Sequence, residues 1–120
     1  MRAKRVVLLT SQSVFAAGVR RLLQDSGDMD LTTVQTDDPE WMEELKRLAP
    51  SVIVMDSTDR YLGKETIARI LEERPRARVV AMNLIHGGID VYRRSRVQQT
   101  DLDGLLEAIH GRRRLRRMRS

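Results

Sequence analysis

The residue in this sequence best suited to chemistry is Asp56, within the stretch SVIVMDSTD at residues 51–59. The four residues before it, 52–55, are apolar and mostly β-branched, which predicts a strand buried on both faces. An aspartate directly after such a strand lies at the carboxyl edge of a sheet, where open α/β folds place their sites. Two interpretations are open. Asp56 is a reactive carboxylate, or it is a strand-end aspartate that accepts hydrogen bonds from nearby backbone amides.

Few other residues are placed for catalysis or metal binding. The chain has no cysteine, which excludes disulfides and thiolate metal sites. His86 and His110 stand without carboxylates at ligand spacing, so we expect neither a histidine metal site nor a nucleophile triad. Asp59, beside Arg60, is interpreted as a solvated turn residue rather than as a metal ligand. We therefore predict that the protein is not an enzyme and needs no cofactor.

Alternating strands and helices are expected to position Asp56. The predicted strands are residues 5–10, 31–36, 51–56, 78–82 and 94–97. The predicted helices lie within residues 14–27, 38–50, 64–75 and 101–111. This alternation implies right-handed crossovers and a parallel sheet covered on both faces. Residues 84–92 contain a Gly-Gly pair and predict a turn rather than a full helix.

Local signals set the ends of two helices. Ser13 is expected to cap the first helix. Asp38 is expected to cap the second helix, with Pro39 at its first position and Pro50 just after its end.

Composition predicts one globular domain. The 120 residues include 41% hydrophobic and 32% charged residues, which is typical of a folded protein. No apolar stretch approaches the roughly 20 residues that span a bilayer. The basic start, MRAKRVVLLTS, is interpreted as leading into a first strand rather than as a signal peptide, and a cytoplasmic location is expected.

The positive charge is concentrated at the carboxyl terminus. The formal net charge is +5, from 22 basic and 17 acidic residues. Six of the basic residues fall within residues 111–120, namely Arg112, Arg113, Arg114, Arg116, Arg117 and Arg119. Removing these six from the 22 leaves 16 basic against 17 acidic residues, so the body at residues 1–110 is nearly neutral. We treat residues 111–120 as an arginine-rich tail with two open interpretations, a solubilising or linker segment or a segment whose charges would neutralise phosphates of a nucleic acid.

Three stretches together resemble the receiver domain of bacterial response regulators, and most closely receivers of the NarL type. VFAAGVRRLL at residues 14–23 is similar to that family's first helix, which typically reads LFxxGLRRLL. PSVIVMD at residues 50–56 is similar to its PDVVLMD, and ARILEERPRARVVAMN at residues 68–83 to its third helix and fourth strand. The resemblance implies a five-stranded parallel, doubly wound, flavodoxin-like α/β fold. The spacing after residue 83 implies a shortened fourth helix.

The same resemblance implies that the phosphorylation machinery is degenerate. Asp56 matches the phosphoacceptor. The acidic pair that holds Mg²⁺ in the family is matched by Thr10 and Ser11, neither of which is anionic. Asn83 matches the switch Thr or Ser, and Gln98 matches the lysine that pairs with the phosphate. We interpret the chain as a pseudo-receiver.

Two functions from different classes remain open. The first is an atypical receiver that acts in signalling or transcriptional regulation by contact with a protein partner or as a homodimer, independently of phosphorylation. The alternative is a small protein that binds nucleic acid non-specifically through its arginine-rich tail. An anionic membrane surface is a weaker partner for the tail, because only Leu115 and Met118 are apolar there.

Overall fold

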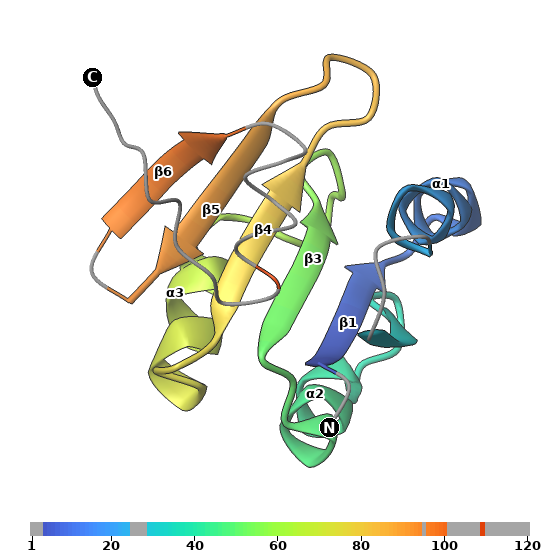
Figure 1. Cartoon of the computed structure of the whole chain (residues 1–120). Helices are drawn as coiled ribbons and strands as arrows, with labels where there is room; N and C mark the ends of the chain where they lie inside the picture. The colour runs from blue at the N-terminus through green and yellow to red at the C-terminus, as the bar shows by residue number, and fades with distance from the viewer. Residues whose placement is uncertain (1–3, 25–28, 95, 101–108, 110–120) are drawn as a thin grey trace.

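The computed structural model describes residues 4–24, 29–94, 96–100 and 109, and its elements are drawn in Figure 1. The strands are β1 (Lys4–Thr10), β2 (Met29–Gln35), β3 (Val52–Asp56), β4 (Arg78–Met82), β5 (Ile89–Arg93) and β6 (Arg96–Thr100). The helices are α1 (Ser13–Leu23), α2 (Trp41–Leu48) and α3 (Lys64–Glu73). Up to β4, strands and helices alternate along the chain, which confirms the predicted α/β class.

The described strands form one sheet in the order β2-β1-β3-β4-β5-β6 (Figure 1). The strands from β1 to β4 run parallel to one another, and their order is compatible with a flavodoxin-like topology. By contrast, β5 is antiparallel to β4, and β6 is antiparallel to β5. The prediction of five strands that are all parallel is therefore wrong, since the sheet is mixed and has a sixth strand.

The short connection after β4 explains this reversal. Only residues 83–88 separate β4 from β5, whereas a parallel crossover needs a dozen or more residues. The Asn83 amide donates to the Gly88 carbonyl at 2.9 Å, and the Gly87 amide donates to the Asn83 carbonyl at 2.6 Å. Gly87 has a φ of 75°, a left-handed conformation that glycine adopts without steric cost. The predicted shortened fourth helix is thus replaced by a turn, and the predicted strand at 94–97 by β5 and β6.

Alternate residues of the central strands point to opposite faces and build two apolar layers. The first layer contains Val6, Leu8, Phe15, Ala16, Val19, Leu23, Val52, Val54, Val80, Met82, Ile89, Val91 and Ile109. The second contains Val7, Leu9, Val34, Met42, Leu45, Ile53, Met55, Ile67, Ile70, Leu71, Ala77, Val79 and Ala81. Helix α1 covers the first layer, and α2 and α3 cover the second.

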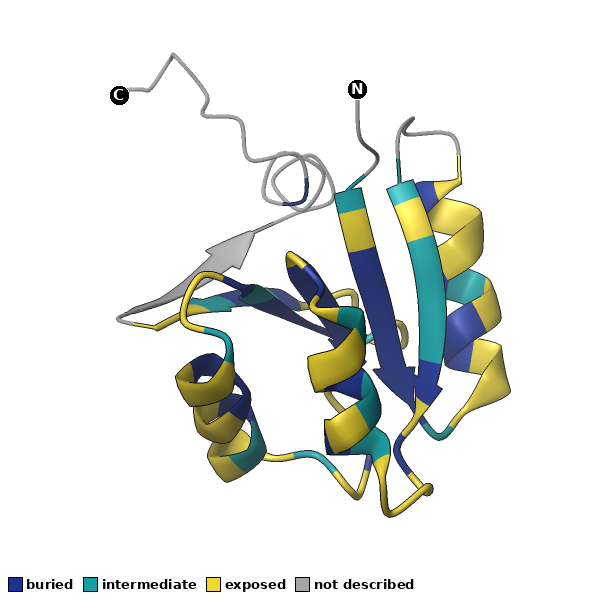
Figure 2. Cartoon of the chain, turned by 90° about the horizontal axis from the view of Figure 1, so that it is seen from below, coloured by how far each residue is buried: buried dark blue, intermediate teal, exposed yellow. Residues whose placement is uncertain are grey.

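The burial pattern fits a sheet covered on both faces. Each helix has a buried side and an exposed side, and β1 is buried from Val6 to Thr10 (Figure 2). Ile109 is helical and fully buried in the first layer. The rest of the helix predicted at 101–111 lies outside the described residues.

The predicted caps act differently from expectation. Ser13 is the first residue of α1 rather than its cap. The cap position is occupied by Gln12, which makes no side-chain capping hydrogen bond. The Asp38 Oδ1 accepts a hydrogen bond from the Glu40 amide at 2.9 Å, so Asp38 organises a turn just before α2 begins. Helix α2 begins at Trp41, so the predicted first position at Pro39 is wrong by two residues.

Candidate functional site

The candidate site lies at the carboxyl edge of the parallel strands, where β1 sits between β2 and β3. The strand order reverses at this point, since β2 lies on one side of β1 and β3 on the other. In folds of this kind, a crevice forms there, outside the carboxyl ends of the strands. The ends of β1, β2, β3 and β4 bring together side chains that are far apart in sequence. These are Thr10, Ser11, Thr36, Asp56, Asp59 and Asn83.

Asp56 ends β3 and is buried, with 6% of its surface exposed. Its Oδ1 accepts hydrogen bonds from the Thr58 amide at 2.9 Å and from the Thr58 hydroxyl at 2.6 Å. This geometry is that of a strand-end aspartate holding the next turn, one of the two interpretations from the sequence. Its match to the family's phosphoacceptor, without use as one, stays a prediction.

Asp59 is the most extensively bonded side chain at this edge. It is 5% exposed, so the prediction of a solvated turn residue is wrong. Its Oδ2 accepts from the Ser11 amide at 2.8 Å, the Ser11 hydroxyl at 3.1 Å and the Thr36 hydroxyl at 3.0 Å. Its Oδ1 accepts from the Tyr61 amide at 2.8 Å. The carboxylate therefore links the loops that follow β1, β2 and β3 through hydrogen bonds.

These hydrogen bonds set the ionisation of Asp59. Burial by itself raises its pKa, because a carboxylate loses hydration there. The bonds from Ser11, Tyr61 and Thr36 favour the charged form and together lower the pKa below its ordinary value of 3.8. Asp59 is consequently an anion at neutral pH that is already satisfied by protein donors.

The two residues that match the family's acidic pair serve the backbone and Asp59. Thr10 is buried, and its hydroxyl oxygen accepts from the Gln12 amide at 2.9 Å. Ser11 donates both its amide and its hydroxyl to Asp59. The structure thus places both residues at the predicted edge and gives them neutral hydrogen-bonding roles.

The remaining two predicted site residues are Asn83 and Gln98, and only Asn83 lies at the expected edge of the sheet. Asn83 lies at this edge, where its Oδ1 accepts from the Ile85 amide at 3.0 Å and the His86 amide at 3.1 Å, holding the β4–β5 turn. Gln98 lies in β6, level with Val91, so its expected position at the end of a strand beside β4 is wrong. Three strand spacings of about 4.8 Å place its backbone about 14 Å from β3.

An open pocket of about 270 Å³ lies beside Asp56. Its lining residues are Gln12, Val14, Phe15, Asp56, Thr58, Asn83, Leu84 and Ile85. Val14 and Ile85 are 80% and 84% exposed, and Leu84 is 41% exposed. The pocket therefore combines a buried carboxylate with an apolar rim that faces solvent.

Sequence reasoning missed this rim. Val14 follows the helix start but falls outside the inner face of α1, and residues 84–85 are apolar within a segment predicted to be a turn. Both are apolar residues at positions where burial is not expected. Apolar residues at positions expected to be exposed were therefore the sequence feature that could have indicated this rim.

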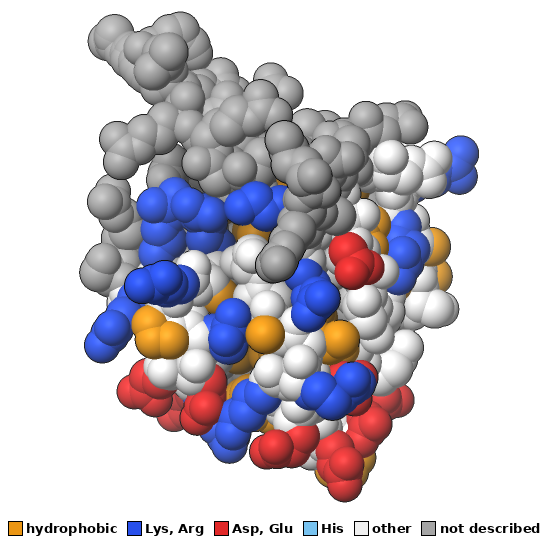
Figure 3. Space-filling model, turned by 60° about the horizontal axis from the view of Figure 1, so that its bottom comes forward, with side chains coloured by type: hydrophobic (Ala, Val, Ile, Leu, Met, Phe, Trp, Pro, Cys, Tyr) orange, Lys and Arg blue, Asp and Glu red, His pale blue; other side chains and the backbone are white. Residues whose placement is uncertain are grey.

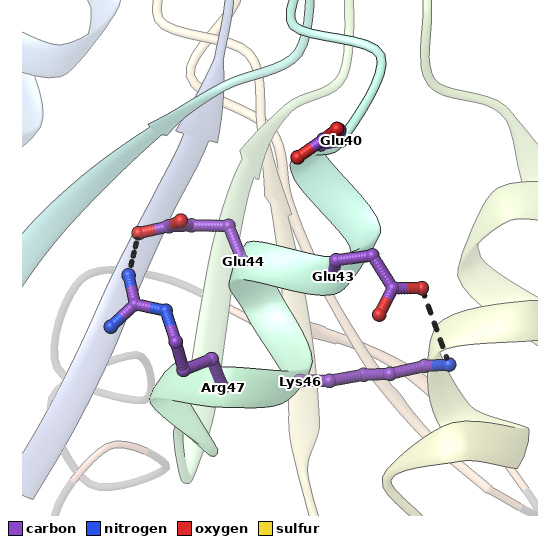
Figure 4. A pocket seen from close by; sticks show the side chains of 5 residues that line it. All are labelled: Glu40, Glu43, Glu44, Lys46 and Arg47. Atoms are coloured by element: carbon purple, nitrogen blue, oxygen red, sulfur yellow. Dashed lines mark hydrogen bonds and ion pairs between the residues drawn. The ribbon is translucent and has the colours of Figure 1, made fainter.

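A second hollow lies along the outer face of α2 (Figure 4). It is lined by Glu40, Glu43, Glu44, Lys46 and Arg47. Arg47 pairs with Glu44, and Lys46 lies 3.8 Å from Glu43, all from one helix. Exposed pairs of this kind contribute little stability and form no enclosed site, so we assign this hollow no function.

Other site types find no support in the described part of the chain. No group of three or more metal-ligating side chains occurs among the described residues. No helix there is long and apolar enough to cross a membrane. His86 is exposed, whereas His110 and the tail arginines lie outside the described residues.

Comparison with known proteins found no matching family model, curated protein or solved structure.

Proposed function

We propose that this protein is a non-catalytic interaction module, a degenerate receiver-like domain of flavodoxin-like type. In this proposal it acts in signalling or transcriptional regulation by protein–protein contact and independently of phosphorylation. The observation that carries the proposal is the pocket beside Asp56, in which an apolar rim surrounds a carboxylate that Thr58 alone bonds among the described residues.

The apolar rim supports contact with a protein. Val14 and Ile85 expose most of their surface, and Leu84 adds a third apolar side chain at the same pocket. Each such side chain gains about 1.5–3 kcal/mol when it is fully buried. A group of exposed apolar side chains beside polar residues is typical of a protein interaction site.

The carboxylate indicates the chemistry of the partner. Asp56 takes part in none of the ion pairs among the described residues. A guanidinium or ammonium group would complement a carboxylate in a pocket that apolar side chains also line. We therefore commit to a partner that presents a lysine or arginine flanked by apolar side chains.

The side chains at this edge of the sheet support a function that does not depend on phosphorylation. Phosphoryl transfer to an aspartate relies on carboxylates that hold Mg²⁺ and on cations that offset the phosphoryl charge. Here Thr10 and Ser11 are neutral, and the nearby Asp59 is committed to protein donors. A phosphoryl group on Asp56 would add negative charge close to Asp59 with little compensation.

Independence from phosphorylation is tested with small phosphodonors. We would incubate the protein with Mg²⁺ and acetyl phosphate or beryllofluoride, and record its mass and amide NMR spectrum with Asp56→Asn as control. No adduct and no Mg²⁺-dependent shift are expected. A stoichiometric adduct that requires Asp56 would show that the protein works by phosphorylation.

The contact surface is tested separately by NMR titration with an acetylated and amidated Leu-Arg-Leu peptide. Amide shifts are expected at Val14, Thr58 and Ile85, and Asp56→Asn should abolish them. A Leu-Gln-Leu peptide serves as the matched ligand without the charge. Equal shifts with both peptides, or shifts unaffected by Asp56→Asn, would contradict recognition of a cation at this pocket.

A further inference from the structure

Arginines from three neighbouring strands stand level at the opposite end of the sheet from Asp56. Val79 pairs with Tyr92 in the antiparallel register, so the next step along the ladder brings Arg78 of β4 level with Arg93 of β5. Arg93 in turn pairs with Arg96 of β6. Arg94 follows in the turn. We call Arg78, Arg93 and Arg94 the arginine row; its two strands lie about 4.8 Å apart.

The arginine row concentrates like charges. Like charges directly opposite each other on neighbouring strands are destabilising. Burial, together with the charge of Arg93, lowers the pKa of the Arg78 guanidinium below its ordinary value. A fold that keeps such charges adjacent gains stability when an anion lies against them.

The arginines at the end of β5 are accessible. Arg93 and Arg94 are exposed, and neither takes part in an ion pair among the described residues. Figure 3, in which the bottom of the Figure 1 view comes forward, shows most of the Lys and Arg side chains spread over the upper part of the face in view and most of the acidic side chains along its lower part. The face therefore has a basic side available to a partner.

We infer that the arginine row binds the phosphodiester backbone of a nucleic acid. This goes beyond the proposed protein contact, which uses the other end of the sheet. Guanidinium groups suit phosphates because their planar donors match two phosphate oxygens at once. Contacts to phosphates do not distinguish one base sequence from another, so the binding is non-specific.

The alternative anion, a lipid surface, fits the same face less well. Binding at a membrane interface also needs apolar or aromatic side chains beside the cations. Among the described residues, four of the five exposed large apolar side chains lie at the other end of the sheet. These four are Val14, Tyr61, Leu84 and Ile85.

The test measures binding of the full chain to a fluorescein-labelled DNA duplex of about 20 base pairs by anisotropy, between 50 and 300 mM salt. The variant is R93Q/R94Q, and the matched control is R60Q/R69Q, which removes the same charge from two other exposed arginines. We expect R93Q/R94Q to weaken binding about tenfold or more at 100 mM salt. The slope of log K against log salt should fall by about 1.8, because each lost duplex phosphate contact removes about 0.9.

The control variant should change affinity about twofold at most, and R93K/R94K, which keeps the charges, should retain most of the binding. Circular dichroism establishes that each variant is folded. Equal weakening by R93Q/R94Q and R60Q/R69Q would overturn the inference, because net charge alone would explain it. Loss of binding on removal of residues 112–120, with R93Q/R94Q unchanged, would assign the binding to the tail instead. Binding to anionic vesicles without binding to DNA would replace the nucleic acid by a membrane.

Discussion

Replacing Asp59 by alanine should be the most damaging change at the carboxyl edge of the sheet. The substitution removes the acceptor of four hydrogen bonds, three to Oδ2 and one to Oδ1. Hydrogen bonds to a charged group contribute about 1.5–3 kcal/mol each, and a buried donor left unpaired costs a further amount. Because the Ser11 and Tyr61 amides belong to loops that water can reach after the change, we expect a net loss of about 3 kcal/mol.

Thermal unfolding followed by circular dichroism converts this loss into a temperature. Unfolding entropies of about 2.1 cal/mol/K per residue give about 0.25 kcal/mol/K for a chain of this length. The midpoint for Asp59→Ala should therefore fall by about 12 °C. Asp38→Ala is the matched control, because Asp38 is exposed and accepts a single hydrogen bond, so its loss should be about 1 kcal/mol. A shift for Asp59→Ala no larger than that of Asp38→Ala would refute the structural role assigned to Asp59.

The pH dependence of folding stability provides a second test of Asp59, with Asp59→Asn as the variant. The pKa of Asp59 is lowered in the folded protein, so the unfolded chain binds the proton more readily. The stability that the carboxylate contributes is present above its unfolded pKa and is lost as the pH falls through the folded pKa. The difference in stability between the wild type and Asp59→Asn should thus be constant near neutrality and shrink below about pH 4. A difference that stays constant down to pH 3 would contradict the assigned ionisation.

Three further substitutions test other parts of the structure. Gly87→Ala should cost about 1 kcal/mol, measured by urea unfolding, because Gly87 has a φ of 75°; an unchanged midpoint would contradict the turn described at Asn83. Arg93→Thr should raise stability by about 0.5 kcal/mol in the same assay by relieving repulsion from Arg78, and a clear loss would argue against that repulsion. Ile85→Ser should leave stability within about 0.5 kcal/mol, since this side chain is 84% exposed, while reducing the shifts caused by the Leu-Arg-Leu peptide; a large destabilisation would mean that Ile85 belongs to the core.

Much of the fold followed from patterns that are local in sequence. The apolar runs at residues 6–9, 52–55 and 79–82 are buried in strands, and the helical spacing in residues 14–23 places Phe15 and Val19 in the core. These predictions succeeded because a strand buried on both faces and an amphipathic helix each leave a direct periodic signal. The location of Asp56 at the carboxyl edge followed for the same reason.

The second half of the sheet could not be predicted in this way. The sequence predicts a turn or a shortened fourth helix over residues 84–92, whereas the chain turns back at Gly87 and forms β5 at Ile89–Arg93. A short strand that contains polar residues has weak periodicity, and its direction depends on whether the preceding loop is long enough to cross the sheet. The position of Gln98 was misplaced as a consequence.

The α/β class, the first four strands, the absence of disulfides and the neutral character of Thr10 and Ser11 can be predicted from the sequence, because they depend on residue type and short-range spacing. The fold was needed to find that Asp59 bonds to Ser11, Thr36 and Tyr61, and that Arg93 lies level with residues of two neighbouring strands. Such contacts join segments separated by loops, so their partners depend on strand order and register. The physical reason is that pairing across a sheet is a non-local property, which no single segment encodes.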